Sequence, residues 1–313
     1  MLSVLGYRIL SEGYARRLEG VPEAMGKAMR MLRRASVASD KISSIVFSRD
    51  RPLQLHALIS SYLAKFDFPP AMEVLYSVSD SEYLDAYEAL KKEFVNSNVR
   101  FLKETNFRED LLNTLRSLGD SRVFFLVDDI VFIRPVTTSI LTQFPLVSGI
   151  LSLRLGPAIN YSYTRNANQR VPEFTRSEPG LLTWEWEGQD IDWGYPFSVD
   201  GHVFWAPEIL TLAEYVEFQR PNSFESSMQF FSPYFASRRG YIFEAPRLVN
   251  IPCNRVQDEI HNIHGELHQA ELLSYWKDGL RIDYEKLADV NTNSCHQELP
   301  FSFRTATARS RGE

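Results

Sequence analysis

The sequence has few cysteines and no long apolar run. Its two cysteines, Cys253 and Cys295, form no CxxC pair, so neither a disulfide framework nor a structural zinc site is indicated. No stretch approaches the roughly eighteen apolar residues of a membrane-spanning helix. The first thirty residues lack the apolar core of a secretory signal peptide. These absences predict a protein of a reducing, cytoplasmic compartment.

An excess of basic charge is also missing. The formal net charge of the 313-residue chain is −6, which gives no support to nucleic-acid binding. The segment 1–40 is an exception, because Arg and Lys are interleaved there with Leu and Met. We expect an N-terminal helical extension that is either docked on the main domain or in peripheral contact with the inner face of an anionic membrane.

From residue 41 onward, short apolar runs alternate with stretches of helical periodicity, a pattern typical of βαβ units and a mostly parallel sheet. Residues 136–313 contain many short strand and turn signals and predict a mixed β region. The run 182–193 alternates Trp with Glu or Asp around a turn, which predicts a hairpin whose rings either pack in the core or form a carbohydrate platform. The expected strands are 42–47, 72–78, 99–102 and 123–127, and the expected helices are 53–66, 82–96 and 109–118.

The most informative feature is the pair Asp128-Asp129, which follows the apolar run 123–127. Burying an unpaired carboxylate costs several kcal/mol, so two in succession imply a metal, a cationic partner or an exposed strand end. The simpler alternative is a solvated acidic turn. Ser48-Arg49-Asp50 and Ser79-Asp80 likewise follow strands. Since parallel strands end at one edge of a sheet, these groups predict a nucleotide-binding crevice.

The turn Ser48-Arg49-Asp50-Arg51-Pro52 between a strand and a helix, the acid Asp80, and Val127-Asp128-Asp129-Ile130 together resemble the nucleotide-sugar glycosyltransferases of the GT-A fold, particularly the bacterial family 2-like enzymes. The resemblance covers residues 42–135. It implies a GT-A-like α/β fold with a Rossmann-like, mostly parallel central sheet flanked by helices and a mixed β acceptor region. One domain, 41–313, would contain a donor half at 41–135 and an acceptor half at 136–313.

The same resemblance implies a metal-dependent enzyme of the hexosyltransferase type, active in glycan or polysaccharide assembly. It would move a sugar from a UDP- or GDP-linked donor to a glycan or small hydroxyl acceptor, with Mn²⁺ or Mg²⁺ to neutralise the diphosphate. By motif position, Asp129 would bind the metal, with His296 completing the shell and His202 as a weaker alternative. Val127 stands where the family has its first acid.

Five further residues are implied in nucleotide-sugar binding: Ser48, Arg49, Arg51, Asp80 and Asp128. Asp80 has an alternative role as a helix cap, and the arginines have one in surface salt bridges.

A transferase also needs a general base for the acceptor hydroxyl. The candidates are Glu225, before an expected helix, and Asp200, which precedes Gly201 between two β runs and is also a candidate donor-sugar contact. Their alternatives are a first-turn helix acid and a plain turn.

Three other interpretations remain open. A sugar nucleotidyltransferase would require a glycine-rich loop after its first strand, and residues 48–52 contain no glycine. A catalytically degenerate carbohydrate-binding protein would account for Val127. Finally, His261, His264 and His268 share a helical spacing, which suits either a metal cluster or an exposed helix face.

Overall fold

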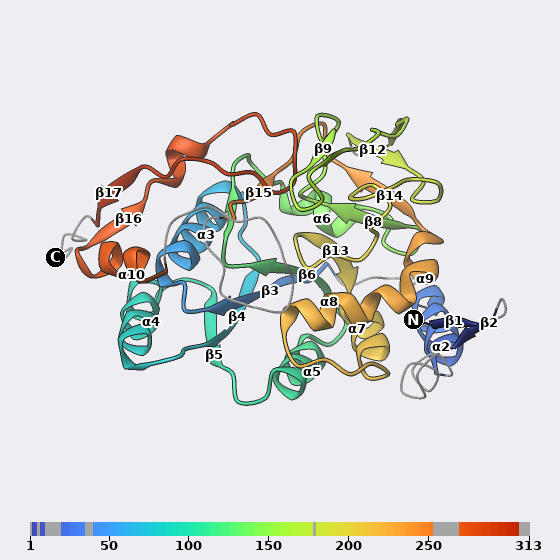
Figure 1. The fold of residues 1–313 in the computed structure, drawn as a ribbon, viewed down its shortest axis with the longest axis horizontal. Helices are drawn as coiled ribbons and strands as arrows, with labels where there is room; N and C mark the ends of the chain where they lie inside the picture. Colours follow the sequence, from blue (N-terminus) through green and yellow to red (C-terminus); the bar gives the residue numbers. More distant parts are fainter. Residues whose placement is uncertain are drawn as a thin grey trace.

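The computed structural model describes residues 2–4, 7–9, 20–34, 40–177, 180–252 and 269–306. A nine-stranded sheet forms their centre (Figure 1). In spatial order its strands are β11 (Thr175–Ser177), β12 (Leu181–Trp184), β14 (Arg239–Ile242), β8 (Gly149–Ser152), β13 (His202–Trp205), β6 (Arg122–Val127), β3 (Ile42–Arg49), β4 (Ala71–Ser77) and β5 (Val99–Lys103).

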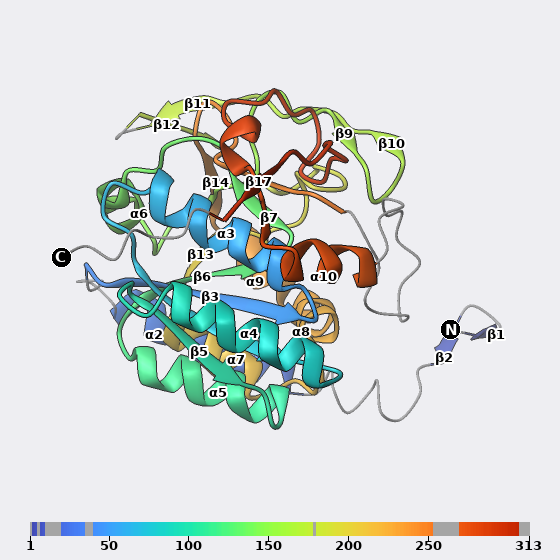
Figure 2. The same cartoon turned by 90° about the vertical axis from the view of Figure 1, so that its left-hand side faces the viewer.

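The half formed by residues 41–135 is doubly wound. Strands β6, β3, β4 and β5 are parallel and are linked by α3 (Pro52–Lys65), α4 (Ser81–Glu93) and α5 (Phe107–Leu118). Figure 2 shows α3 and α5 on opposite sides of the sheet. The chain runs outward from β3 to β5 and then returns to β6, on the other side of β3. The strand order therefore reverses between β3 and β6, which is where open α/β sheets bind ligands.

Residues 136–313 continue the same sheet with mixed pairing. β13 is antiparallel to both β6 and β8, whereas β14 is parallel to β8. The predicted α/β class, with a parallel half and a mixed half, is confirmed. The strands and helices expected from residue 42 to residue 127 are confirmed as well, within a few residues at each end.

Tryptophan-rich residues 182–193 do not form the expected hairpin. Only β12 is a strand there, and its partners are β11 and β14. Trp184, Trp186 and Trp193 are buried, with Trp184 and Trp193 in an edge-to-face contact at 5.1 Å. Large rings bury more apolar surface by packing on one another than a two-stranded ribbon would allow. The prediction of a carbohydrate platform on these rings is therefore wrong, and the core alternative is correct.

The N-terminal segment is only partly helical. Helix α2 (Val21–Arg34) buries Val21, Ala24, Ala28 and Leu32 and packs against α7 (Ala206–Ala213), so this helix is docked on the main domain. Leu2–Val4 (β1) and Tyr7–Ile9 (β2) instead form an antiparallel pair, and the helical prediction is wrong for them. None of the described helices has the length and apolarity needed to cross a membrane.

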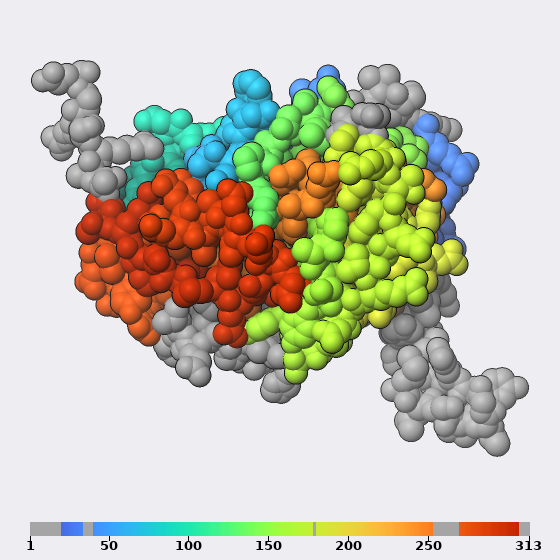
Figure 3. Space-filling model, turned by 90° about the horizontal axis from the view of Figure 1, so that it is seen from above, coloured from blue at the N-terminus to red at the C-terminus, as the bar shows by residue number. Residues whose placement is uncertain are grey.

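A short two-stranded ribbon lies at the edge of the sheet where β6 ends. β7 (Ile130–Phe132) pairs with β15 (Leu248–Asn250), so that Asn250 lies opposite Ile130. The C-terminal segment then crosses this region, with a bridge between Asn250 and His296. Figure 3 shows its residues, in red, against the yellow-green segment that follows β8, where the Ser294 hydroxyl accepts a hydrogen bond from the Tyr163 N–H group.

The remaining described elements surround this frame. They are α6 (Thr138–Gln143), β9 (Tyr161–Ser162), β10 (Ala167–Asn168), α8 (Pro221–Met228), η1 (Gln229–Phe231), α9 (Ser232–Ala236), α10 (Gln269–Lys277), β16 (Leu280–Ile282), η2 (Tyr284–Leu287) and β17 (Phe303–Thr305).

Candidate active site

Asp128 joins the ends of β3 and β6. Its Oδ2 accepts hydrogen bonds from the Ser48 hydroxyl at 2.9 Å and from the Arg49 N–H group at 3.0 Å. The Ser48 hydroxyl also lies 2.5 Å from the Tyr87 hydroxyl. Because Asp128 is almost fully buried, these bonds replace the water that its carboxylate loses. The predicted convergence of polar groups at one sheet edge is present.

Arg51 supplies the cation for the acid pair. Its Nη1 lies 2.9 Å from Asp128 Oδ1 and 3.1 Å from Asp129 Oδ2. The turn is shaped by Asp50, whose φ of +54° is in the left-handed region and whose Oδ1 accepts from the Ser79 N–H group at 2.8 Å. Pro52 then begins α3. Arg51 is thus an interior partner of both acids, not a surface salt bridge.

Asp129 is less well compensated. Burial raises its pKa, the nearby Asp128 and Asp200 raise it further, and only Arg51 and His296 lower it. Its Oδ1 accepts a long hydrogen bond, 3.4 Å, from Asn250 Nδ2. The local charge is therefore negative, which favours a proton or an additional cation.

Asn250 connects Asp129 to Asp200. Its Nδ2 also lies 3.3 Å from Asp200 Oδ1, while its own Oδ1 is buried and has no hydrogen-bond partner. An orphaned amide oxygen beside two carboxylates is a ready ligand for a hard cation. His296 Nε2 stands 3.6 Å from Asp200 Oδ2 and completes the same group.

Asp200 is held on its other side by Arg154, whose Nη1 lies 3.4 Å from Asp200 Oδ2. Arg154 also contacts Asp192 at 3.1 Å, and Asp192 in turn accepts from Gln169. Gly201 follows Asp200 with a φ of +80°, so the turn alternative for Asp200 correctly describes its backbone. The carboxylate nonetheless faces this charged network.

Glu225 lies next to this network. Its Oε1 accepts from the N–H group of Val199, the neighbour of Asp200, at 3.1 Å. Burial, and after it the charge of Asp200, raises the pKa of Glu225 to about 7, although Arg154 acts in the opposite direction. The expected position before or in the first turn of a helix is wrong, because α8 begins at Pro221 and Glu225 lies in its second turn. A carboxyl group with a pKa near 7 suits general acid–base catalysis.

The side chains of other predicted residues make contacts outside the group formed by Asp128, Asp129 and Asp200. Asp80 caps α4, where its Oδ1 accepts from the N–H groups of Glu82 and Tyr83. The Arg49 side chain is half-exposed beside Asp50 at 3.5 Å. His202 is wholly buried in β13, and burial lowers its pKa to about 3. His261, His264 and His268 are outside the described residues.

The residues present fit a cation that is shared with a substrate. Throughout the described part of the chain, no group of three or more His, Cys, Asp or Glu side chains is arranged to hold a metal ion. The orphaned Asn250 oxygen and the excess negative charge around Asp129 nevertheless leave oxygen ligands there. Mg²⁺ in phosphate-binding sites often takes only one or two carboxylates and completes its shell with phosphate oxygens and water.

Sequence reasoning missed Asn250, Arg154 and Asp192. A signal was present for the first, because Leu248-Val249-Asn250 is again an apolar run ended by a polar residue. Arg154 likewise follows the apolar segment that contains β8. Nothing in the local pattern of Asp192 pointed to the site, since its role depends on a partner 38 residues away.

Comparisons with known proteins give weak matches only. No family model and no curated protein matches the chain. A fragment of TarS from S. aureus, residues 1–349, matches with 16% identity over 65% of this chain and 58% of that chain, at a TM-score of 0.42. Its complex with UDP-GlcNAc matches with 17% identity over 65% of this chain and 56% of that chain, at a TM-score of 0.41. The apo WbbM bifunctional glycosyltransferase matches with 13% identity over 67% of this chain and 39% of that chain, at a TM-score of 0.37.

The chain thus spans 58% of the TarS fragment and 39% of WbbM. At such TM-scores these matches carry no argument about function.

Proposed function

We propose that the chain is a glycosyltransferase that takes its sugar from a nucleotide-sugar donor. The most direct support is the arrangement of charged residues at the point where the strand order reverses. Asp128, Asp129 and Arg51 form one cluster there, and a second carboxylate pair, Asp200 and Glu225, lies beside it. The first cluster suits a charged diphosphate, and the second suits proton transfer at the sugar.

In this proposal Glu225 is the general base. Its carboxylate takes the proton of the acceptor hydroxyl as that oxygen forms a bond to the anomeric carbon and the nucleoside diphosphate leaves. Asp200 is paired with Arg154 and lies near Glu225. In this position Asp200 contacts the donor sugar or orients the acceptor. A base with a pKa near the working pH is ionised in part of the molecules and still a strong proton acceptor.

On the donor side, Asp128 acts mainly by position. Both of its oxygens already accept hydrogen bonds, from Ser48, Arg49 and Arg51, so it holds the strand ends and the Arg51 guanidinium in place. Asp129 and His296, together with the free Asn250 oxygen, would bind Mn²⁺ or Mg²⁺. Such an ion would supply positive charge for the leaving diphosphate.

The test is donor turnover. We expect the purified protein to release UDP or GDP from a matching panel of nucleotide sugars, with acceptor or slowly with water. Glu225→Gln should lower this rate by roughly 10²–10⁴-fold and leave nucleotide binding intact. An exposed glutamate on another part of the surface, Glu244, provides the control as Glu244→Gln. Equal rates in the Glu225 variant and in the unmodified protein would exclude Glu225 as the base.

A further inference from the structure

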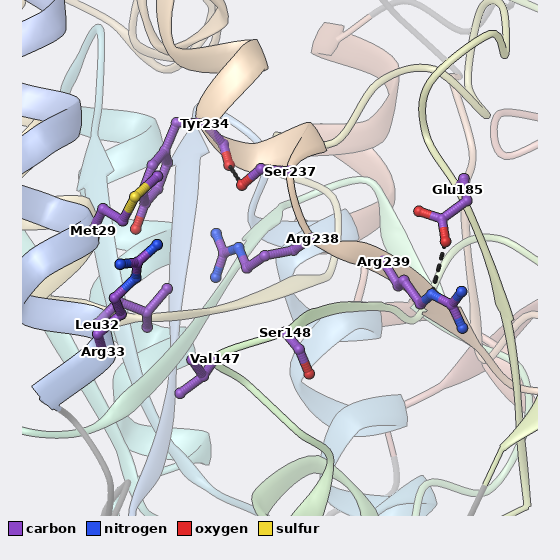
Figure 4. Close-up of a pocket in the computed structure, with 10 residues that line it drawn as sticks. All are labelled: Met29, Leu32, Arg33, Val147, Ser148, Glu185, Tyr234, Ser237, Arg238 and Arg239. Atoms are coloured by element: carbon purple, nitrogen blue, oxygen red, sulfur yellow. Dashed lines mark hydrogen bonds and ion pairs between the residues drawn. The ribbon is translucent and has the colours of Figure 1, made fainter.

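A cavity with both polar and apolar lining lies away from the candidate active site. It has a volume of about 450 Å³ and is bordered by α2, the end of α9, the residues before β8 and the start of β14. Figure 4 shows residues from these segments facing one another across the opening. A volume of this size accommodates a small organic molecule.

The strand directions place this cavity at the opposite edge of the sheet. Arg239 and Gly149 are paired at the starts of β14 and β8. β8 runs in the same direction as β6, because both are antiparallel to β13. The cavity therefore lies at the edge where β6 begins, whereas Asp128 follows its end. Six residues of strand separate the two edges by roughly 20 Å, so this is not part of the donor site.

Arg238 is the central feature of the wall. Its side chain is only 4% exposed, and its Nη1 lies 3.2 Å from Glu208 Oε1 and 3.3 Å from the Leu146 carbonyl oxygen. Its Nε and Nη2 are buried and have no hydrogen-bond partner. Buried donors without acceptors are costly, and an acceptor oxygen beside this guanidinium would remove part of that cost.

The lining combines positive charge with apolar surface. Arg33, Arg238 and Arg239 border the cavity together with one acid, Glu185. Glu185 is paired with Arg239 at 2.7 Å, and Arg238 is paired with Glu208 behind the wall. Arg33 is exposed at the end of α2, which leaves its charge available across the cavity from Arg238. Met29, Leu32 and Val147 supply the apolar part. Two guanidinium groups facing one space offer several hydrogen-bond donors to a phosphate, and Arg is the residue best suited to phosphate.

We propose that this cavity binds an organic phosphate monoester, with the phosphate between Arg33 and Arg238 and the apolar group against Met29, Leu32 and Val147. The ligand would come either from solution or from the headgroup of an acidic lipid, because both present the same chemistry. This proposal is independent of the glycosyltransferase activity.

The test is calorimetric titration of phenyl phosphate into the full chain. We expect saturable binding, weakened at least about tenfold by Arg33→Ala, since one charge-assisted contact is lost. Val147→Trp, at a position that is 42% exposed, should block the cavity without disturbing the core. Arg30→Ala removes another exposed arginine from the same helix and should leave binding unchanged. Melting temperatures of all variants confirm that they are folded.

Absence of saturable binding would overturn the proposal, as would equal affinity in the Arg33 and Val147 variants and the unmodified protein. An equal loss in Arg30→Ala would also overturn it, because the attraction would then be unspecific. Flotation with phosphatidylcholine vesicles, with and without phosphatidic acid, identifies the source. Arg33-dependent flotation assigns the ligand to a lipid, and titration without flotation assigns it to solution. Since the titration requires no nucleotide, its failure leaves the proposed function untouched.

Discussion

At the scale of single residues, we expect Glu225 to set the pH dependence of the activity and to contribute to the pH dependence of folding stability. Its pKa, raised to about 7 mainly by burial, means that the base is lost to protonation below that pH. Activity should therefore rise through pH 7 and level off above it. A pH–rate profile that stays flat between pH 5.5 and 8.5 would contradict the role of Glu225 as base.

The same raised pKa has a consequence for folding. The folded protein binds a proton at Glu225 more tightly than the unfolded chain does, so the stability contribution is present at low pH and is lost as the pH rises through about 7. Glu225→Gln cannot ionise, and we expect it to be more stable than the unmodified protein at pH 8 but not at pH 5. Thermal unfolding at the two pH values measures this difference, and a lower melting temperature of the variant at pH 8 would refute it.

Arg51 offers a second test at this scale. Arg51→Ala leaves Asp128 and Asp129 without their shared cation, and breaking a buried ion pair from one side typically costs about 3–5 kcal/mol. The control is Arg176→Ala, which removes an exposed pair with Glu244 at 2.8 Å and should cost less than about 1 kcal/mol. Urea unfolding of both variants gives the two values. Similar costs would mean that Arg51 is not an interior partner of the acids.

At the scale of elements, the turn before β13 fixes the position of Asp200. A Cβ atom on Gly201 would lie 2.7 Å from Leu248 Cδ2, in a backbone with a φ of +80°. Gly201→Ala should therefore destabilise the protein by about 1–3 kcal/mol and shift Asp200 out of line with Asn250 and Arg154. Gly279→Ala is matched, with a φ of +74° but nothing within 4 Å. Loss of transfer activity in the first variant alone would confirm the role of this turn.

Elements with strong periodicity were predictable from sequence, and those defined by distant partners were not. β3 and β6 are buried along almost their whole length and contain the apolar stretches 45–47 and 123–127, which is why Ser48 and Asp128 could be expected at one edge. Pro221 in the first turn of α8 is a helix start signal, and it places Glu225 inside the helix and not before it. The Trp residues after β12 resembled an alternating strand, but their burial depends on packing that no local pattern contains.

At the scale of the whole molecule, the doubly wound half and the mixed half meet between β6 and β13. The Asp128–Asp129–Arg51 cluster lies on one side of this boundary and the Asp200–Glu225 pair on the other, with Asn250 connecting Asp129 to Asp200. The candidate site therefore depends on both halves of one continuous sheet. Beyond β6, the sequence predicted Asp200, Glu225 and His296 as site residues. It did not predict Arg154, Asp192 or Asn250, because their roles depend on partners that lie far away in the chain.

The most direct test of the central claim is calorimetric titration of UDP and GDP, each with and without Mn²⁺, into the unmodified protein and into Asp129→Asn. We predict that one nucleotide binds, that Mn²⁺ strengthens its binding, and that Asp129→Asn removes the effect of the metal. Asp80→Ala serves as the comparison for a residue that caps α4. If neither nucleotide binds in any condition, the chain is not a nucleotide-sugar transferase.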